Sequence, residues 1–435
     1  MAITFISFLG TGNYNEVPYI DEKGTVYKTK YIQSALIQKH KDKLNNNSAH
    51  IKIFVTHEAK QTHWEPPHTL KDELTAFIPN ANIVAIDINT ITTEQSIWEL
   101  FDIIYNQIDE NTDLIIDITH GFRSLPIVLL VIVNYARFLK NINILGIFYG
   151  AFEGKNDQGV PIIELTQLDQ LLQWNNAVYS FLNTGNAYHI SILTNKQAGQ
   201  IIKSTNNVNI YTENSLAKAI KEIWPILSTC RSKEIINGDA FIKIKDILQE
   251  IENRETINIK PIGTLLSKIK NVVMYYEKDS VANLLIAVYF CITYKLVQVG
   301  ITLLQEGLIT ILLYSIGIDE YFSRNNRETV SRYFAFLDQP EIKENPINDE
   351  NYKFTATRLS NREVVKSLKT PFNKLRDIRN DINHAAYTDQ DIRANVFEQK
   401  LIHVYKETLT ILIKSKDISD KRIGNTAKSL LEKLD

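Results

Sequence analysis

The first 165 or so residues alternate short apolar runs with helix-like segments, and this alternation constrains the fold more than any other feature of the chain. Strands separated by helices favour a mostly parallel sheet with both faces covered, so an α/β N-terminal domain is predicted. The predicted strands are Ile3 to Leu9, Ile51 to Thr56, Ile83 to Ile88, Leu114 to Thr119 and Ile142 to Tyr149, with an edge strand at Pro161 to Thr166.

The rest of the chain is predicted to be helical, because the strand pattern fades after about Leu168. Helical spacing marks Leu216 to Trp224 and Ala240 to Glu252, and Asp239 is expected to cap the second segment. Leu284 to Ile316 is a strongly apolar helical region. With 435 residues there is room for two or three domains, so helical domains are expected after the α/β domain.

The composition argues against several classes of protein. A formal net charge of -2 gives no global signal for binding a polyanion. Cys230 and Cys291 lie far apart, so neither a disulfide framework nor a cysteine zinc site is indicated, and a reducing cytoplasm fits. The apolar runs Leu125 to Ala136 and Val281 to Tyr294 are shorter than a bilayer span, and no charged leader is recognised, so no membrane segment is expected.

Polar residues follow three of the predicted strands, where open parallel sheets bind ligands. The first segment is Gly10-Thr11-Gly12-Asn13, whose amides and side chains suit an anion, although a simple tight turn is the alternative. Asn15 stands where a dinucleotide fingerprint needs its third glycine, which disfavours a nicotinamide-dependent enzyme. In the second segment, which holds Thr56, Glu58 and Ala59, ligand contact and an ordinary helix N-cap are equal alternatives.

The third segment, Asp117 to Pro126, gives the strongest of these signals, because a buried strand leads directly into polar, flexible and basic residues before a helix. His120 and Arg123 can contact phosphate or base edges, and Gly121 permits close approach. The hydroxyl of Ser124 can cap the helix that follows. The candidate ligand-binding residues of this segment are Thr119, His120, Gly121, Phe122, Arg123 and Ser124.

Near the C-terminus, Arg379 and His384 are separated by four residues inside a predicted helix, with Asn380 directly after the arginine. Leu375, Ile378, Ile382 and Ala385 mark the buried stripe, so Asn380 and His384 are expected to project outward on the opposite side. Arg379 lies about 140° around the axis from His384, which favours a site completed by a helix bend or a second copy. A fixed positive charge beside a group that moves protons near neutral pH suits phosphodiester cleavage.

The surroundings of this motif are basic. Eight basic and two acidic residues lie between Lys353 and Arg379, a local net charge of +6 that favours a phosphate-bearing substrate, although surface solvation explains such a run equally well. Asp377 and Asp381 lie nearby, but two acids on a basic helix fit charge balance better than a metal cage, so no metal is expected.

Taken together, these motifs and their order resemble a CRISPR-associated ribonuclease that joins a CARF sensor domain to a HEPN effector domain. The resemblance rests on the Gly10 loop, the Thr56 segment, the Asp117 to Pro126 segment and the Arg379 to His384 match to the HEPN motif. It implies a Rossmann-like sensor that pairs with its twin and binds a cyclic oligoadenylate, which activates cleavage of single-stranded RNA by a HEPN pair. A homodimer, or an oligomer of dimers, is implied as well.

The resemblance also implies roles for residues of the motif. His384 would move protons as a ribose 2′-hydroxyl attacks phosphorus, Arg379 would stabilise charge on the phosphoryl oxygens, and Asn380 would orient one of these groups. The expected domains are a sensor over residues 1–190, a helical connector over 191–280 and a HEPN domain over 281–435. The alternative function is a nucleotide-sensing regulator that binds RNA or a partner through a catalytically inactive helical domain.

Overall fold

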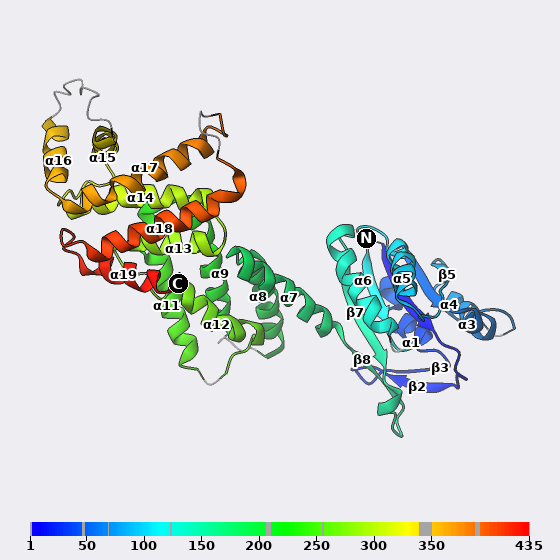
Figure 1. The fold of residues 1–435 in the computed structure, drawn as a ribbon. Helices are drawn as coiled ribbons and strands as arrows, with labels where there is room; N and C mark the ends of the chain where they lie inside the picture. The colour runs from blue at the N-terminus through cyan, green and yellow to red at the C-terminus, as the bar shows by residue number, and fades with distance from the viewer. Residues whose placement is uncertain are drawn as a thin grey trace. The chain divides into compact units, whose positions relative to one another are not determined.

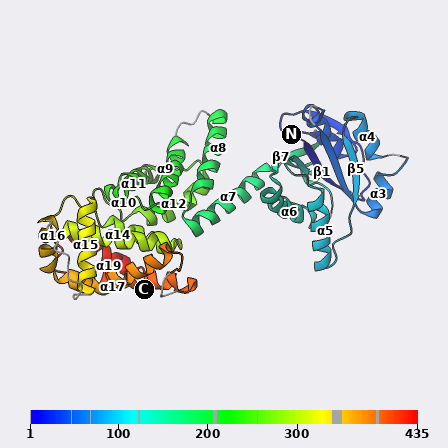
Figure 2. The same ribbon diagram turned by 90° about the horizontal axis from the view of Figure 1, so that it is seen from above.

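The computed structural model describes residues 2–45, 48–67, 69–121, 124–205, 210–254, 256–338, 350–387 and 392–434. The chain divides into two compact units, Met1–Asn175 and Asn176–Asp435 (Figure 1). The first unit is built on a sheet and the second entirely from helices among the described residues, as Figure 2 also shows. This confirms the predicted order of an α/β domain followed by a helical region.

The N-terminal unit holds one sheet of eight strands in the order β3-β2-β8-β7-β6-β1-β4-β5. Parallel pairing joins β5, β4, β1, β6 and β7, whereas β8 is antiparallel to β7 and β3 is antiparallel to β2. The strands are β1 (Ile3–Leu9), β2 (Val17–Ile20), β3 (Val26–Thr29), β4 (Ala49–Val55), β5 (Asn82–Asp87), β6 (Asp113–Asp117), β7 (Asn143–Gly150) and β8 (Val160–Glu164).

The predicted strands are confirmed to within a few residues, but the edge position predicted for Pro161 to Thr166 is wrong. Strand β8 lies inside the sheet, between β7 and β2, because the hairpin of β2 and β3 extends the sheet beyond it. That hairpin was not predicted, since its strands are only four residues long and one contains Pro18. Its turn is held by Asp21, whose carboxylate accepts hydrogen bonds from the amides of Lys23 and Thr25 at 3.0 and 2.8 Å.

Helices cover both faces of this sheet, as the continuous apolar strands predict. On one face the buried side chains of α1 and α4 pack on Phe5 of β1, and on the other those of α5 and α6 pack on its neighbour Ile6. The helices of this unit are α1 (Ile32–Lys39), α2 (Lys41–Asn45), α3 (His57–His63), α4 (Leu70–Phe77), α5 (Glu94–Gln107) and α6 (Leu125–Lys140), with a short 3-10 turn η1 (Phe152–Gly154).

Helix α7 (Thr166–Thr184) spans the boundary between the units, and the C-terminal unit continues from it. The predicted segments Leu216 to Trp224 and Ala240 to Glu252 are confirmed inside α9 and α11. The remaining helices are α8 (Tyr188–Thr205), α9 (Ile210–Ser228), α10 (Ser232–Asn237), α11 (Asp239–Glu252), α12 (Lys260–Val273), α13 (Asn283–Thr293), α14 (Val297–Ser315), α15 (Arg324–Asp338), α16 (Glu350–Ser360), α17 (Glu363–Asn383), η2 (Ala394–Val396), α18 (Phe397–Lys414) and α19 (Lys421–Leu431).

The cap predicted at Asp239 is wrong. The N-cap of α11 is Gly238, in the left-handed region at φ 78°, and Asp239 is the first helical residue with no capping side-chain bond. Gly238 also ends α10, and a Cβ there would lie 2.4 Å from the carbonyl oxygen of Glu277, so the tight junction between the two helices requires glycine.

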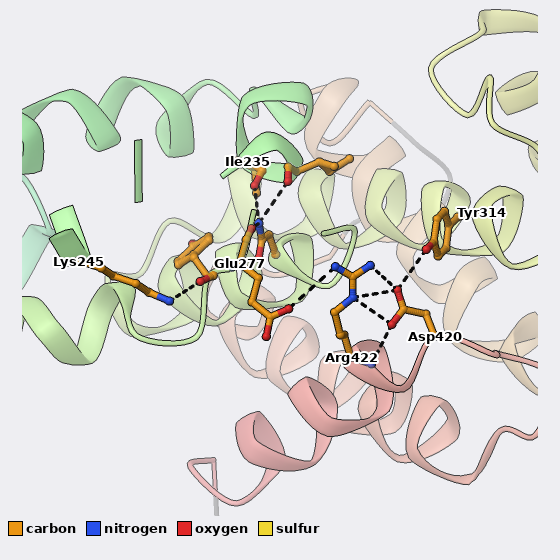
Figure 3. Close-up of polar contacts among 9 residues, drawn as sticks. Ile235, Lys245, Glu277, Tyr314, Asp420 and Arg422 are labelled. Atoms are coloured by element: carbon orange, nitrogen blue, oxygen red, sulfur yellow. Dashed lines mark hydrogen bonds and ion pairs between the residues drawn. The ribbon is translucent and has the colours of Figure 1, made fainter. Parts of the chain in front are cut away.

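The core of the helical unit is formed by the apolar helices α13 and α14. Helix α14 is long and apolar enough to cross a membrane, but most of it is buried against the other helices of this unit. Figure 3 shows how the C-terminal helix α19 is attached. Its N-cap Asp420 accepts hydrogen bonds from the amide of Arg422 at 2.9 Å and from the hydroxyl of Tyr314 on α14 at 3.2 Å. The Arg422 guanidinium beside Asp420 lowers the pKa of that carboxyl.

Candidate functional site

A small cavity of about 160 Å³ lies at the carboxyl ends of the parallel strands. It is lined by Phe8 and Leu9 from β1, Phe54 from β4, Ile88 after β5, Leu125 from α6, and Gly10, Thr11, Thr56 and Gly121 from the connections. Parallel strands end at one edge of a sheet, and this is why residues more than a hundred positions apart meet here. The structure thus brings together four of the predicted ligand-binding residues: Gly10, Thr11, Thr56 and Gly121.

Of the other predicted ligand-binding residues, those that the structure describes do not line this cavity. Gly12 and Asn13 are exposed on the loop, and Glu58 is exposed in the first turn of α3. Ala59 is buried beneath that turn, and its amide donates to the hydroxyl of Thr56 at 3.3 Å. The N-cap interpretation of Thr56 is therefore confirmed, and the same residue also lines the cavity. Phe122 and Arg123 lie outside the described residues.

The prediction that Ser124 caps α6 is only half right. Ser124 occupies the N-cap position of α6, but its side chain makes no capping hydrogen bond and its backbone is already helical, at φ -78° and ψ -27°. Pro126 within the first turn has no amide hydrogen, so one of the donors that a cap would satisfy is absent.

A buried carboxylate fixes the ends of β1 and β6 beside the cavity. Asp117 accepts hydrogen bonds from the Ser7 hydroxyl at 2.7 Å and from the hydroxyl and amide of Thr119 at 2.5 and 3.0 Å. Burial raises the pKa of Asp117 to about 6, although these hydrogen bonds oppose the shift. The Thr119 hydroxyl also accepts the amide of Gly150 at 2.8 Å, so Thr119 holds β6 to β7 rather than facing the cavity.

The Gly10 loop is closed by a tyrosine that the sequence did not single out. The Gly10 amide donates to the hydroxyl of Tyr14 at 3.0 Å, so the donor expected to meet an anion already has a partner. The ring of Tyr14 lies 4.6 Å from the ring of His63 and 4.8 Å from that of His120. His63 in turn bonds the carbonyl oxygen of Gly12 at 2.8 Å through Nε2. These contacts hold the loop in a fixed conformation at the edge of the cavity.

The ring of His120 packs on Tyr14 near the cavity. Its Nε2 is buried and makes no hydrogen bond to the described residues, and burial lowers the pKa of its imidazole to about 4. His120 is therefore neutral near pH 7. A neutral imidazole with a free ring nitrogen can donate to or accept from a ligand, depending on its tautomer.

In the helical unit, the RxxxxH motif lies at the end of α17, and His384 is its C-cap residue. Asn380 and His384 are both exposed, as predicted, and Leu375 and Ile378 are buried. The expected stripe stops there. The helix ends at Asn383, so Ala385 lies outside it, exposed, with φ at 52°.

Arg379 is tied to a different helix. Its Nη1 donates to Oε1 of Glu306 on α14 at 2.8 Å and to Oε1 of Gln305 at 3.3 Å. The other oxygen of Glu306 accepts from Nη2 of Arg327 on α15 at 2.6 Å. One carboxylate thus serves two guanidinium groups, and this trio carries a net charge of +1. Sequence reasoning missed Glu306 because it lies 73 residues from Arg379 on an apolar helix.

Much of the basic run that precedes the motif is already engaged. Lys374 pairs with Glu407 at 3.0 Å, and Arg376 pairs with Asp338 and Asp377, each at 3.3 Å. Arg358 and Arg362 donate to backbone carbonyls of Ile316, Asp417 and Ser315. The local charge of +6 therefore overstates the cationic surface offered to a phosphate, because the count ignored partners from other helices.

A second cavity of about 450 Å³ opens beside the motif helix, between α17 and α18. Its lining includes Lys374 and Asp377 from α17 and Lys400 and His403 from α18. The strand-end cavity lies entirely in the N-terminal unit, and this second cavity lies entirely in the helical unit. Among the described residues, no group of three or more His, Cys, Asp or Glu side chains gathers in the manner of a metal site.

The fold joins an α/β unit with a strand-end cavity to a helical unit, and comparison with known proteins finds domain models that match parts of the chain. Residues 4–153 match the model of the CARF domain of the CRISPR system endoribonuclease Csx1. Residues 170–275 match the model of the second domain of the CRISPR-associated protein MJ1674. The predicted likeness of the N-terminal unit to a CARF domain is thereby confirmed, whereas these matches leave residues 276–435 uncovered.

One curated protein is similar to part of the chain in sequence, and one solved structure aligns with nearly all of it. The CRISPR-associated protein MJ1674 of Methanocaldococcus jannaschii is 29% identical over 133 residues, which are 30% of this chain and 21% of that protein. The match thus spans about a fifth of the relative. The structure of Enterococcus italicus Csm6 bound to cyclic hexa-2'-fluoro-hexa-dAMP aligns over 99% of this chain and 98% of that one, at 10% identity and a TM-score of 0.43. A score this low supports no argument about ligand or mechanism.

Proposed function

We propose that this protein is a CRISPR-associated ribonuclease that binds a cyclic oligoadenylate in its N-terminal unit and in response cleaves single-stranded RNA. The observation that carries the proposal is the pairing of two features in one chain. A CARF-like unit has four of its predicted residues around one strand-end cavity, and a helix of the other unit carries Arg379 and exposes Asn380 and His384. The proposed division is a sensor over residues 1–190, a connector over 191–280 and a HEPN effector over 281–435, working in the cytoplasm.

In the proposed reaction the ribose 2′-oxygen forms a bond to the adjacent phosphorus while the bond from phosphorus to the 5′-oxygen breaks. The 2′-hydroxyl proton leaves and the 5′-oxygen gains a proton, and His384 is the group suited to these transfers. The guanidinium of Arg379 stabilises charge on the phosphoryl oxygens, and the +1 charge of its trio with Glu306 and Arg327 is complementary to one phosphate. Because the nucleophile is internal, no metal-activated water is needed.

A homodimer is part of the proposal, and an exposed apolar face of the sensor supports it. Ile127, Val131 and Phe138 recur at helical spacing on α6 and are 66%, 62% and 67% exposed. Together with Trp98 on α5 and Tyr135 on α6, which are 59% and 50% exposed, they form an apolar face. At about 150–250 Å² per aromatic side chain, its three rings alone leave on the order of 350 Å² uncovered.

The position of this face on α6 supports the choice of a second copy as its occupant. It runs along α6, whose first residue, Leu125, lines the strand-end cavity. A two-fold axis passing along α6 would therefore place two cavities side by side, which suits a ligand made of repeated nucleotides. A second copy of the chain is the occupant proposed for this face.

The proposed chemistry is tested by its products. RNA incubated with the protein and activator in excess chelator is expected to yield fragments ending in a 2′,3′-cyclic phosphate, and a deoxyribose at the cut position is expected to block cleavage. Strict dependence on an added divalent metal would contradict the scheme. A protein that binds oligoadenylate and RNA but never cleaves would instead support the alternative of a regulator with an inactive helical domain.

A further inference from the structure

Tyr14 is hydrogen-bonded to a backbone amide at the edge of the strand-end cavity. Its hydroxyl accepts the amide of Gly10 at 3.0 Å, and Gly10 lines the cavity. The hydroxyl also fills the space beside Gly10, because a Cβ built on that glycine would lie 2.8 Å from it. Any ligand atom that approaches the Gly10 amide must therefore displace the hydroxyl of Tyr14.

The tyrosine is held in this place by its ring. Tyr14 packs between His63, His120 and Tyr31, with ring centroids 4.6, 4.8 and 5.5 Å away. Burial is the main cause that raises the pKa of Tyr14 to about 12, so its hydroxyl is a neutral acceptor near pH 7. A phosphate oxygen carries a negative charge and accepts a backbone hydrogen bond more strongly than a neutral hydroxyl does.

We propose that the Tyr14 hydroxyl is a built-in competitor for the ligand, which takes the Gly10 amide in the empty sensor and gives it up to a phosphate oxygen when a nucleotide binds. The inference rests on the proposed oligoadenylate function for the identity of the ligand. The ring of Tyr14 stays in its aromatic surroundings in both states, so only the hydroxyl changes partner. Tyr14 thereby sets the threshold concentration of the activator.

Removing the Tyr14 hydroxyl is expected to tighten ligand binding rather than weaken it. In Tyr14→Phe the ring contacts remain but the Gly10 amide has no partner in the empty state, so binding no longer breaks a hydrogen bond. A hydrogen bond of ordinary net strength corresponds to binding of cyclic oligoadenylate that is about three- to ten-fold tighter than wild type. Tyr14→Ala is expected to bind more weakly than Tyr14→Phe, since it also loses the ring that orders the loop.

The test is isothermal titration of the full-length protein with cyclic tetra-adenylate and cyclic hexa-adenylate. Tyr27→Phe is the matched control, because it removes a hydroxyl bonded to Asp21 at 3.1 Å in the same unit but outside the cavity. The expected result is tighter binding by Tyr14→Phe and wild-type binding by Tyr27→Phe. Equal or weaker binding by a folded Tyr14→Phe protein would overturn the inference.

A second measurement separates this inference from the proposed function. If the wild type binds neither cyclic oligoadenylate, the proposed ligand is wrong, and the competition is then tested with inorganic phosphate on protein labelled with [15N]glycine. Phosphate is expected to shift the Gly10 amide signal at a lower concentration in Tyr14→Phe than in wild type. A Gly10 signal that responds identically in the two proteins would refute competition at this amide.

Discussion

The two candidate sites are built in opposite ways. The strand-end cavity collects residues from the ends of β1 and β4, from the connections after β5 and β6, and from the start of α6, which the sheet brings to one edge within a single chain. The RxxxxH motif lies on one helix, which spreads its residues around the axis. Arg379 is bound to Glu306 on α14, whereas His384 is exposed at the end of α17. A sheet edge can complete a ligand site alone, but a single helix needs a second surface to complete a catalytic one.

The largest expected effect comes from the exposed residue of the motif. His384→Ala should lower the rate of RNA cleavage by about 10²–10⁴-fold, the usual contribution of a positioned acid or base. Its melting temperature should not change, because His384 lies at the end of α17 with its side chain in solvent. Cleavage and thermal unfolding measured on one preparation check both statements. His189→Ala, at an exposed histidine of α8 that lines neither cavity, is the control, and wild-type turnover by His384→Ala would remove His384 from the mechanism.

Substitutions in the apolar face of α6 test whether two copies of the chain form a dimer through this face. Val131→Glu and Phe138→Glu place a charge among exposed apolar side chains and should raise the dimer dissociation constant by about 100-fold, the cost of burying an unpaired charge. Analytical ultracentrifugation gives this constant. Tyr211→Glu, at a side chain 54% exposed on α9, is the control that should leave the dimer intact. Unchanged association of both α6 variants would place the dimer interface elsewhere.

Cleavage by a Glu306 variant tests whether the helical site depends on contacts between helices. Glu306→Gln keeps the shape but removes the charge that holds Arg379, so cleavage should slow by about 10-fold, as expected when a partly buried charged hydrogen bond is lost. If Glu306 acts through Arg379, the double variant with Arg379→Ala should cleave no more slowly than Arg379→Ala alone. Glu328→Gln removes a carboxylate paired with Arg324 on α15 and serves as the control. A fully additive loss in the double variant would show that Glu306 works independently of Arg379.

The smallest expected effect is a dependence of the stability of the N-terminal unit on pH. Burial lowers the pKa values of His40 and His120 to about 4, below the ordinary value of about 6.5, so the unfolded chain binds more protons between these limits. Stability of the N-terminal unit is therefore present above pH 6.5 and is lost as the pH falls towards 4. Asp117 opposes this, because its raised pKa of about 6 lets the folded state bind the extra proton between pH 4 and 6.

Urea unfolding of this unit at pH 7 and pH 5 measures the balance. His120→Asn should weaken the loss of stability in acid, and Asp117→Asn should make that loss steeper. Proteolysis of residues 1–175 followed by mass spectrometry reports on the sensor separately from the helical unit. Identical pH profiles for the wild type and both variants would contradict the assigned burial of these two side chains.

The contrast between the strand-end cavity and the helical motif also explains which features could be predicted from the sequence. Strand positions and strand-end residues follow from local apolar runs, so Gly10, Thr11, Thr56 and Gly121 were found and do meet at one cavity. The outward direction of Asn380 and His384 follows from helical periodicity alone. These predictions need only the geometry of one element and the rule that parallel strands end together.

Contacts between elements could not be predicted in this way. Tyr14 reaches Gly10 because the loop folds back on itself, and Glu306 reaches Arg379 from another helix. The inner position of β8 depends on a hairpin whose strands are too short to show an apolar pattern. Each of these contacts is decided by tertiary packing rather than by local spacing.

The central claim is that a ligand in the sensor switches on cleavage by the helical unit. It is tested most directly by measuring cleavage of a labelled single-stranded RNA with and without a panel of cyclic and linear oligoadenylates, in wild type and His384→Ala. The account predicts slow cleavage without ligand, strong activation by one cyclic oligoadenylate, and no activation in His384→Ala although that variant still binds the ligand. Full cleavage by the wild type without any oligoadenylate would contradict it.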